Sequence, residues 1–103
     1  MDDLTKEQQY LISSMYKEVL NRQPSLDFDH ANYFSDSNEV RNLFFPDSSS
    51  DHVASECWKL FKKGYLYCEP GDNLANNISL TDKTIIYMEN RFSKKLMPSS
   101  ILS

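Results

Sequence analysis

Four side chains could bind a transition metal through nitrogen or sulfur: His30, His52, Cys57 and Cys68. No C-x-x-C or H-x-x-x-H spacing relates them. On an expected helix, His52 and Cys57 stand five residues apart and lie on different faces, which also argues against a catalytic Cys–His dyad. We therefore expect no metal site, and we expect both cysteines to be free thiols, Cys57 in a helix core and Cys68 in a strand.

Other patterns that resemble catalytic groups have simpler structural explanations. The serines at 48–50 precede an expected helix, where a serine caps free backbone N–H groups. Asp27 and Asp29 are expected to be solvated or capping carboxylates. The two glycines, Gly64 and Gly71, cannot form a glycine-rich phosphate loop. We expect no catalytic residue, no cofactor and no enzyme activity.

Capping residues and helical periodicity predict the elements that carry the remaining candidates. A first helix is predicted from Thr5, which stands at capping-box spacing from Gln8, to about Arg22, because Gln23 precedes Pro24. Its apolar stripe is expected to comprise Leu11, Ile12, Met15, Tyr16, Val19 and Leu20. Two alternatives remain for residues 25–36. One is a short helix around 29–34 capped by Asp27, and the other is a loop that places aromatic side chains under the core.

Two more helices are predicted on either side of the polar connector at 46–51. The first is capped by Asp36 or Ser37, ends at Phe45-Pro46, and points Val40, Leu43 and Phe44 inward. The second begins after Ser50 or Asp51 and runs to about Lys63, where Gly64 suits a left-handed terminus. Its expected buried stripe comprises Val53, Ala54, Cys57, Trp58, Leu60 and Phe61, and its expected outward residues are His52, Ser55, Glu56, Lys59, Lys62 and Lys63.

The C-terminal third changes to a strand pattern and then returns to helix. Residues 65–68 and 77–80 are predicted to pair as a β-hairpin around a turn at 69–73. Thr81 is expected to cap a last helix with a stripe at Ile85, Met88, Phe92 and Leu96, with a strand over 83–88 as the alternative. The aromatic residues Trp58, Phe61, Tyr65 and Tyr67 fit core packing better than a stacking platform for single-stranded nucleic acid.

The order of helix, short helix, helix, hairpin and helix resembles a winged helix-turn-helix domain. Two segments carry the resemblance: Lys62-Lys63-Gly64-Tyr65-Leu66 at the end of one helix, and Ile78-Ser79-Leu80-Thr81-Asp82-Lys83 at the start of the last. Residues 85–92, IIYMENRF, are similar to the last helix of small, mostly uncharacterised winged-helix proteins of bacteria and their mobile elements. The resemblance implies an α+β fold, mainly α, with a three-helix core, a two-stranded wing hairpin and a C-terminal helix.

The resemblance also implies a DNA-binding transcriptional regulator. Helix 38–45 would position helix 51–63 in the major groove of double-stranded DNA, and the wing at 66–80 would approach the backbone. The residues implied to face DNA are Ser49, Ser50, His52, Ser55, Lys59, Lys62 and Lys63. Because one small domain buries little surface on DNA, a homodimer is expected, formed through the first helix or through the last helix at Ile85, Tyr87, Met88, Phe92 and Leu96.

The charge distribution keeps a second function open. Residues 1–56 carry a net charge of −7 and residues 57–103 a net charge of +3. The wing has acids and no base, and helix 51–63 lacks the Arg, Asn and Gln that bind bases bidentately. The alternative is therefore a protein-binding winged helix, such as an adaptor, antirepressor or inhibitor, with an acidic docking surface. We expect one cytoplasmic domain over residues 1–97, no membrane segment, and a flexible tail at 98–103.

Overall fold

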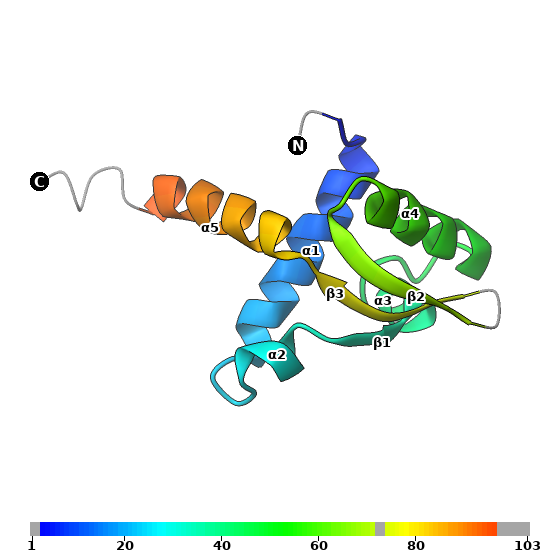
Figure 1. Ribbon diagram of the computed structural model, residues 1–103, viewed down its shortest axis with the longest axis horizontal. Helices are drawn as coiled ribbons and strands as arrows, with labels where there is room; N and C mark the ends of the chain where they lie inside the picture. The colour runs from blue at the N-terminus through cyan, green and yellow to red at the C-terminus, as the bar shows by residue number, and fades with distance from the viewer. Residues whose placement is uncertain (1–2, 72–73, 97–103) are drawn as a thin grey trace, which may run out of the picture.

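The computed structural model describes residues 3–71 and 74–96, and its side-chain description ends at Arg91. Along the chain, the elements are α1 (Lys6–Arg22), α2 (Phe28–Ala31), β1 (Phe34–Asp36), α3 (Ser37–Phe44), α4 (Ser50–Lys62), β2 (Leu66–Gly71), β3 (Leu74–Leu80) and α5 (Asp82–Leu96) (Figure 1). This arrangement confirms the coarser part of the predicted fold class, an α+β fold in which helices predominate. The expected domain end at residue 97 and the expected tail lie outside the described residues.

Helix α1 forms where its caps predict it. The Gln8 backbone N–H donates to Thr5 Oγ1 at 3.1 Å, and the Thr5 N–H donates to Gln8 Oε1 at 3.1 Å, which completes the capping box. The helix ends at Arg22, and Gln23 is extended before Pro24. The predicted stripe is buried except for Leu20, which is exposed because it lies at the edge of the stripe.

The segment at 25–36 contains both a helix and a strand. Asp27 caps α2 as predicted, by accepting from the His30 N–H at 2.9 Å, but the helix ends at Ala31 instead of continuing to Phe34. Phe34 instead lies in β1, fully buried opposite Ile78 of β3. Three residues are too few for an alternating pattern to reveal a strand, and the partner strand lies more than 40 residues away.

The sheet is antiparallel, with strand order β1-β3-β2. The hairpin is longer than predicted, because Glu69, Pro70 and Gly71 belong to β2 instead of the turn. A proline is compatible with this position because β2 is an edge strand. A register shift between Tyr67 and Glu69 marks a bulge, and Asn77 on the opposite strand takes the positive φ of 50°.

Helices α3 and α4 form a consecutive pair that packs on the inner face of the sheet (Figure 1). Asp36, one of the two predicted candidates, caps α3. Ser49 caps α4, so this helix begins at Ser50, one or two residues earlier than the predicted start after Ser50 or Asp51.

Four of the residues predicted to be inward lie at the edge of the core: Leu43 and Phe61 are exposed, and Phe44 and Trp58 are half-buried. The exposure of these residues has one cause: the apolar stripes are narrower than the sequence pattern, because neighbouring elements cover only part of each. Glu56, predicted to face outward, is buried. It is buried for a different reason, because Gln8 of α1 lies against it and donates to its carboxylate.

A left-handed glycine ends α4 and starts the path into the sheet. Gly64 has φ +88°, and its N–H donates to Phe61 O at 3.0 Å, while the Tyr65 N–H donates to Leu60 O at 2.9 Å. This is the hydrogen-bond pattern of a Schellman motif. The Thr81 hydroxyl donates to Gly64 O at 2.8 Å, which ties the start of α5 to the end of α4.

Helix α5 begins at the predicted cap and leaves the body of the molecule. The Thr84 N–H donates to Thr81 Oγ1, and residues 82–96 are helical, so the alternative strand over 83–88 is wrong. Helix α5 packs against α1, and Met88 is fully buried there. Beyond this contact α5 runs away from the sheet (Figure 1). None of the helices in the described part of the chain combines the length and hydrophobicity that crossing a bilayer requires.

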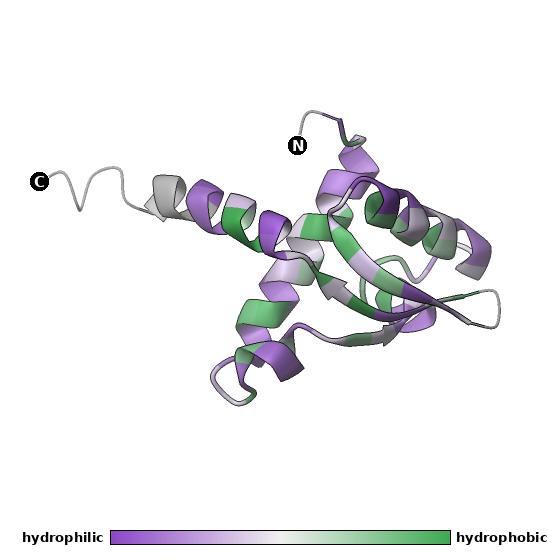
Figure 2. Cartoon of the chain, in the orientation of Figure 1, coloured by the Kyte–Doolittle hydropathy of each residue, from purple (hydrophilic) through white to green (hydrophobic). Residues whose placement is uncertain are grey.

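The core lies between α1, α3, α4 and the inner face of the sheet. Figure 2 shows hydrophobic and hydrophilic residues interspersed along β2 and along the helices. The buried residues recur at helical spacing in α1 and at alternate positions at the start of β2, so each of these elements has one apolar side. The largest fully buried side chains include Phe34, Leu11, Leu60 and Ile78, which come from four different elements. The core is therefore shared by the whole domain and does not belong to any local motif.

Replacing Gly64 with alanine is expected to lower the free energy of unfolding by about 1–2 kcal/mol, because an L side chain is disfavoured at φ +88°. Steric overlap contributes little, since an added Cβ would lie 3.6 Å from its nearest neighbour, Lys83 Nζ. Urea denaturation measures the change. The control, Ser55→Ala on the exposed face of α4, should shift stability by less than about 0.5 kcal/mol. Equal losses in both variants would contradict the prediction.

Candidate functional site

A row of polar side chains follows the outer face of α4. His52, Ser55, Lys59 and Lys62 stand at positions i, i+3, i+7 and i+10, and all four are exposed. Positions with this spacing share one face of a helix. Ser49 and Ser50 lie at the start of the same helix, where the Ser49 hydroxyl accepts from the His52 N–H at 3.1 Å. Helix α4 therefore brings together six of the seven residues predicted to face DNA.

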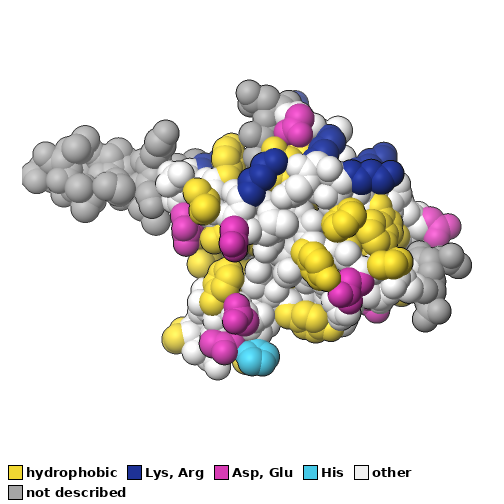
Figure 3. Space-filling model, viewed as in Figure 1, with side chains coloured by type: hydrophobic (Ala, Val, Ile, Leu, Met, Phe, Trp, Pro, Cys, Tyr) yellow, Lys and Arg dark blue, Asp and Glu magenta, His cyan; other side chains and the backbone are white. Residues whose placement is uncertain are grey.

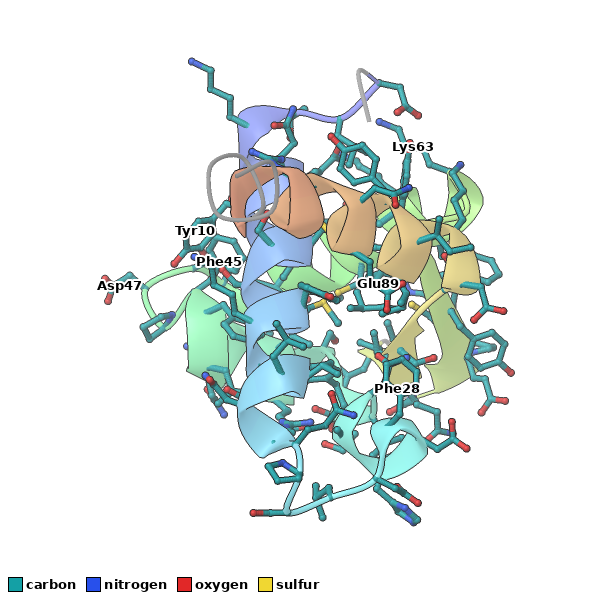
Figure 4. The ribbon with its side chains drawn as sticks, turned by 90° about the vertical axis from the view of Figure 1, so that its left-hand side faces the viewer. Tyr10, Phe28, Phe45, Asp47, Lys63 and Glu89 are labelled. Atoms are coloured by element: carbon teal, nitrogen blue, oxygen red, sulfur yellow. The ribbon has the colours of Figure 1, made fainter. Side chains whose placement is uncertain are left out.

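The seventh residue, Lys63, is turned away from this row. Its ammonium donates to Asp3 O at 2.6 Å and to Gln8 Oε1 at 3.3 Å, so it holds the segment that precedes α1 (Figure 4). Lys83 is a further basic residue next to Lys63. Its Nζ donates to Lys63 O and lies 4.2 Å from the ring centroid of Tyr65. On the face seen in Figure 3, Lys and Arg side chains lie along the upper border with an acidic side chain beside them, and further acidic side chains lie on the other parts.

Three of the four aromatic residues weighed as a stacking platform reach the surface. Trp58 and Phe61 pack edge to face, with ring centroids 5.4 Å apart, and Tyr67 projects from β2. Only Tyr65 is buried. Figure 3 shows hydrophobic side chains gathered over α4 and β2 on this face. The expectation that all four are core residues is therefore wrong, because Tyr67 alternates to the solvent side of an edge strand and the core covers only part of α4.

The β2–β3 hairpin, expected to be a wing, presents a carboxylate near its middle. Glu69 Oε2 accepts from the Tyr67 hydroxyl at 2.6 Å, and Oε1 accepts from Asn77 Nδ2 at 2.6 Å. These two hydrogen bonds hold the pKa of Glu69 below its ordinary value, and the first one raises the pKa of Tyr67. Glu69 is therefore ionised at neutral pH, and this part of the hairpin repels phosphate.

A cluster that the sequence pattern did not reveal joins α1 to α4. His52 Nε2 lies 3.0 Å from both carboxylate oxygens of Glu7, and Glu56 completes a group whose ligand atoms all lie within 4.8 Å of one another. These three are the residues of the described chain that could hold a metal ion together. The available signal was the spacing of four between His52 and Glu56, but Glu7 comes from 45 residues earlier.

Glu56 is buried but satisfied. It is 7% exposed, Gln8 Nε2 donates to its Oε1 at 3.1 Å, and Lys59 Nζ donates to its Oε2 at 3.0 Å. Burial acts to raise the pKa of Glu56, but the hydrogen bonds from Lys59 and Gln8 outweigh burial and leave the pKa below its ordinary value. Glu56 is thus a carboxylate held ionised between two helices.

The cysteines are free thiols, as expected, and both are buried. The Cys68 Sγ lies 3.9 Å from Cys57 O. Burial raises the pKa of each thiol to about 12. Because the thiolate is the form that binds metals and attacks electrophiles, neither cysteine is suited to these reactions at neutral pH.

The proposed dimer residues of α5 do not form one exposed face. Met88 is fully buried in the chain's own core and Ile85 is half-buried, so Met88 in particular is wrong as an interface residue. Tyr87 is exposed, as is Ile86, which the prediction omitted. Phe92 and Leu96 fall outside the described side chains. The helical period places Ile85 and Met88 toward α1, which leaves the opposite side of α5 to solvent.

The Glu56→Gln variant is expected to lose about 1–3 kcal/mol of stability at pH 7, because its neutral amide cannot replace the charge-assisted hydrogen bond to Lys59. Since the folded-state pKa of Glu56 is lowered, the ionised form contributes stability above the ordinary pKa of about 4.3 and loses it as pH falls through the lowered value. The difference between the two proteins should therefore shrink near pH 3. Urea denaturation at both pH values checks this, with Glu89→Gln on exposed α5 as control. A difference independent of pH would contradict the assignment.

Comparison with known proteins found no match, so the function has to be inferred from this geometry. No protein-family model matches the chain, and neither a curated protein nor a solved structure matches it.

Proposed function

We propose that the chain is a winged-helix domain that binds double-stranded DNA through α4. The order of the elements and the sheet order β1-β3-β2 support the proposal, because they suit a core of α1, α3 and α4 with β2 and β3 as the wing. The short strand β1, which pairs with the hairpin, is compatible with the same architecture. In this assignment, α3 and α4 are the helix-turn-helix pair and residues 45–49 are the turn.

The single observation that carries the DNA proposal is the exposed polar row on α4. In a helix-turn-helix, the N-terminal part of the second helix contacts base edges in the major groove. Here that part presents Ser49, His52 and Ser55, and Lys59 and Lys62 follow on the same face. Short hydroxyl groups bind phosphate oxygens, and the lysines supply positive charge along the helix.

The exposed side chains of α4 are better suited to binding phosphate than to binding bases. Lysine and serine bind phosphate without reading sequence, and the wing carboxylate of Glu69 disfavours a backbone contact by the hairpin near that residue. Lys59 also forms an ion pair with Glu56, with the two charged atoms 3.0 Å apart. When Lys59 binds a phosphate, it gives up part of this ion pair. We therefore infer an interaction that depends strongly on salt, with sequence preference coming from a small number of base contacts.

Fluorescence anisotropy with a random duplex of about 20 bp is expected to show binding at about 50 mM salt and a steep loss toward 200 mM. Each of Lys59→Ala and Lys62→Ala should reduce the slope of log affinity against log salt by about one, because each removes one phosphate contact. Lys17→Ala on exposed α1 is the matched control and should leave the slope unchanged. Absence of binding by the wild-type protein at 50 mM salt would contradict the proposal.

We also propose that two copies associate through the outer side of α5. Ile86 is 57% exposed, Tyr87 is exposed, and α5 extends away from the body of the domain, so a second copy could pack along it (Figure 1). A dimer would place two α4 helices on one DNA molecule and so enlarge the interface.

For the dimer, light scattering coupled to size exclusion at about 50 μM is expected to give twice the monomer mass for the wild type. Ile86→Glu should give the monomer mass, because it introduces a charge into the apolar contact. Leu43→Glu, which alters a comparably exposed leucine on α3, is the control and should remain dimeric. A monomeric wild type, or dimers from all three proteins, would contradict the assignment of α5.

The second candidate function is binding to a basic protein partner. The observation that favours it is on α2, where exposed Asp27 and Asp29 flank the partly exposed Phe28. In protein recognition, an apolar side chain that anchors the contact is commonly surrounded by charged residues, which pair with opposite charges on the partner. The DNA experiment separates the two functions, since this candidate requires neither duplex binding nor a salt slope that depends on Lys59 and Lys62.

A further inference from the structure

The cluster of Glu7, His52 and Glu56 has the composition and placement of a metal site that bridges two helices. Glu7 comes from the first turn of α1, while His52 and Glu56 stand four residues apart on α4. A spacing of four places two side chains on the same face of a helix, one turn apart. The three ligand atoms converge within 4.8 Å of one another although the two helices meet only through tertiary packing.

We propose that these three side chains bind one divalent transition-metal ion, of which Zn²⁺ is the best fit. One imidazole nitrogen and two carboxylate oxygens form a mixed set, and imidazole favours Zn²⁺ over Mg²⁺ or Ca²⁺, which take oxygen ligands almost exclusively. Three protein ligands leave the fourth tetrahedral position to water. The proposal concerns ion binding alone and does not depend on the DNA-binding function.

The distances suit this ion after a small adjustment. Bonds of about 2.0–2.2 Å to nitrogen and oxygen place neighbouring tetrahedral ligands about 3.3 Å apart. His52 Nε2 already lies 3.0 Å from each Glu7 oxygen, and all the ligand atoms lie within 4.8 Å of one another, so the farthest pair must approach by no more than about 1.5 Å. Glu7 and His52 are both close to half exposed, so their side chains can rotate to close the gap without displacing the core.

The surroundings hold the third ligand in its metal-binding form. Glu56 is ionised and fixed by Gln8 and Lys59, as described above. Gln8 is itself fixed, because its Oε1 accepts from the Thr5 N–H and from Lys63 Nζ, which turns its amide nitrogen toward Glu56. Ligating carboxylates in metal sites commonly receive such orienting hydrogen bonds. The cysteines do not compete for the ion, because both are buried and their thiols stay protonated.

A bound ion would join α1 to α4 and so stabilise the fold. Glu7 and His52 are separated by 45 residues, and a ligand that binds only the folded chain raises its stability in proportion to the logarithm of the ion concentration above Kd. At a concentration 100 times Kd, the expected rise in Tm is about 10 °C or more for a domain of this size.

Isothermal titration of the full chain with ZnCl₂ tests the site, after treatment with EDTA and removal of any affinity tag. The wild type is expected to bind one Zn²⁺ per chain and to gain thermal stability with ZnCl₂ but not with MgCl₂ at the same concentration. His52→Ala and Glu7→Gln should each weaken Zn²⁺ binding at least 10-fold. Both residues are substantially exposed, so both variants should keep the fold, which circular dichroism verifies.

His30→Ala is the matched control, because His30 also contacts a carboxylate: its Nδ1 lies 2.6 Å from Asp27 Oδ1, but no third ligand joins them in the described chain. This variant should bind Zn²⁺ as the wild type does. The proposal is overturned if the wild type binds no Zn²⁺, if Mg²⁺ stabilises it equally, if His52→Ala and Glu7→Gln bind as the wild type does, or if His30→Ala loses binding to the same extent. Glu7→Gln alone decides the matter if His52→Ala does not fold.

Discussion

The pairing of β3 on both of its edges is the constraint on which the rest of the fold depends. A buried strand must satisfy its backbone N–H and C=O groups with hydrogen bonds, and β3 does so by lying between β1 and β2. Its inner side chains Ala75, Ile78 and Leu80 are buried, and α1, α3 and α4 all contact this strand. Without β3 the hairpin has one strand, β1 has no partner, and the three helices lose the surface on which they pack.

Polar contacts between α1 and α4 then determine which side chains are available at the surface. Gln8 completes the capping box that Thr5 begins and also donates to Glu56, and the ionised Glu56 accepts from Lys59. Lys63 fastens the segment before α1 and leaves the polar row. Part of the positive charge that the sequence places on this helix is therefore used to assemble the domain. Tyr10 and Phe45, side by side in Figure 4 with ring centroids 5.4 Å apart, make a second contact between α1 and the segment that leads into α4.

His52 is common to the DNA-binding proposal and the metal-site proposal, because it belongs to the polar row and to the carboxylate cluster. The two carboxylates, Glu7 beside His52 and Glu56 in the middle of α4, contribute negative potential that opposes the approach of phosphate. A divalent cation held between them would offset that potential, because it adds two positive charges at the same place. The surface of α4 therefore carries the residues proposed to bind DNA and two of the three residues proposed to bind the ion, and a separate experiment tests each.

The sequence by itself determined the local features of this protein: the caps at Thr5, Asp27 and Thr81, the glycine that ends α4, and the polar row along that helix. Each cap and the terminal glycine depend on residues within about one helical turn, and the polar row repeats with the helical period, so spacing alone reveals them. Only the tertiary structure decided that Phe34 pairs with Ile78, that Glu56 is buried, and that Glu7 reaches His52. These contacts join residues more than 40 positions apart, and they exist because packing around β3 brings separate elements together, which no local period records.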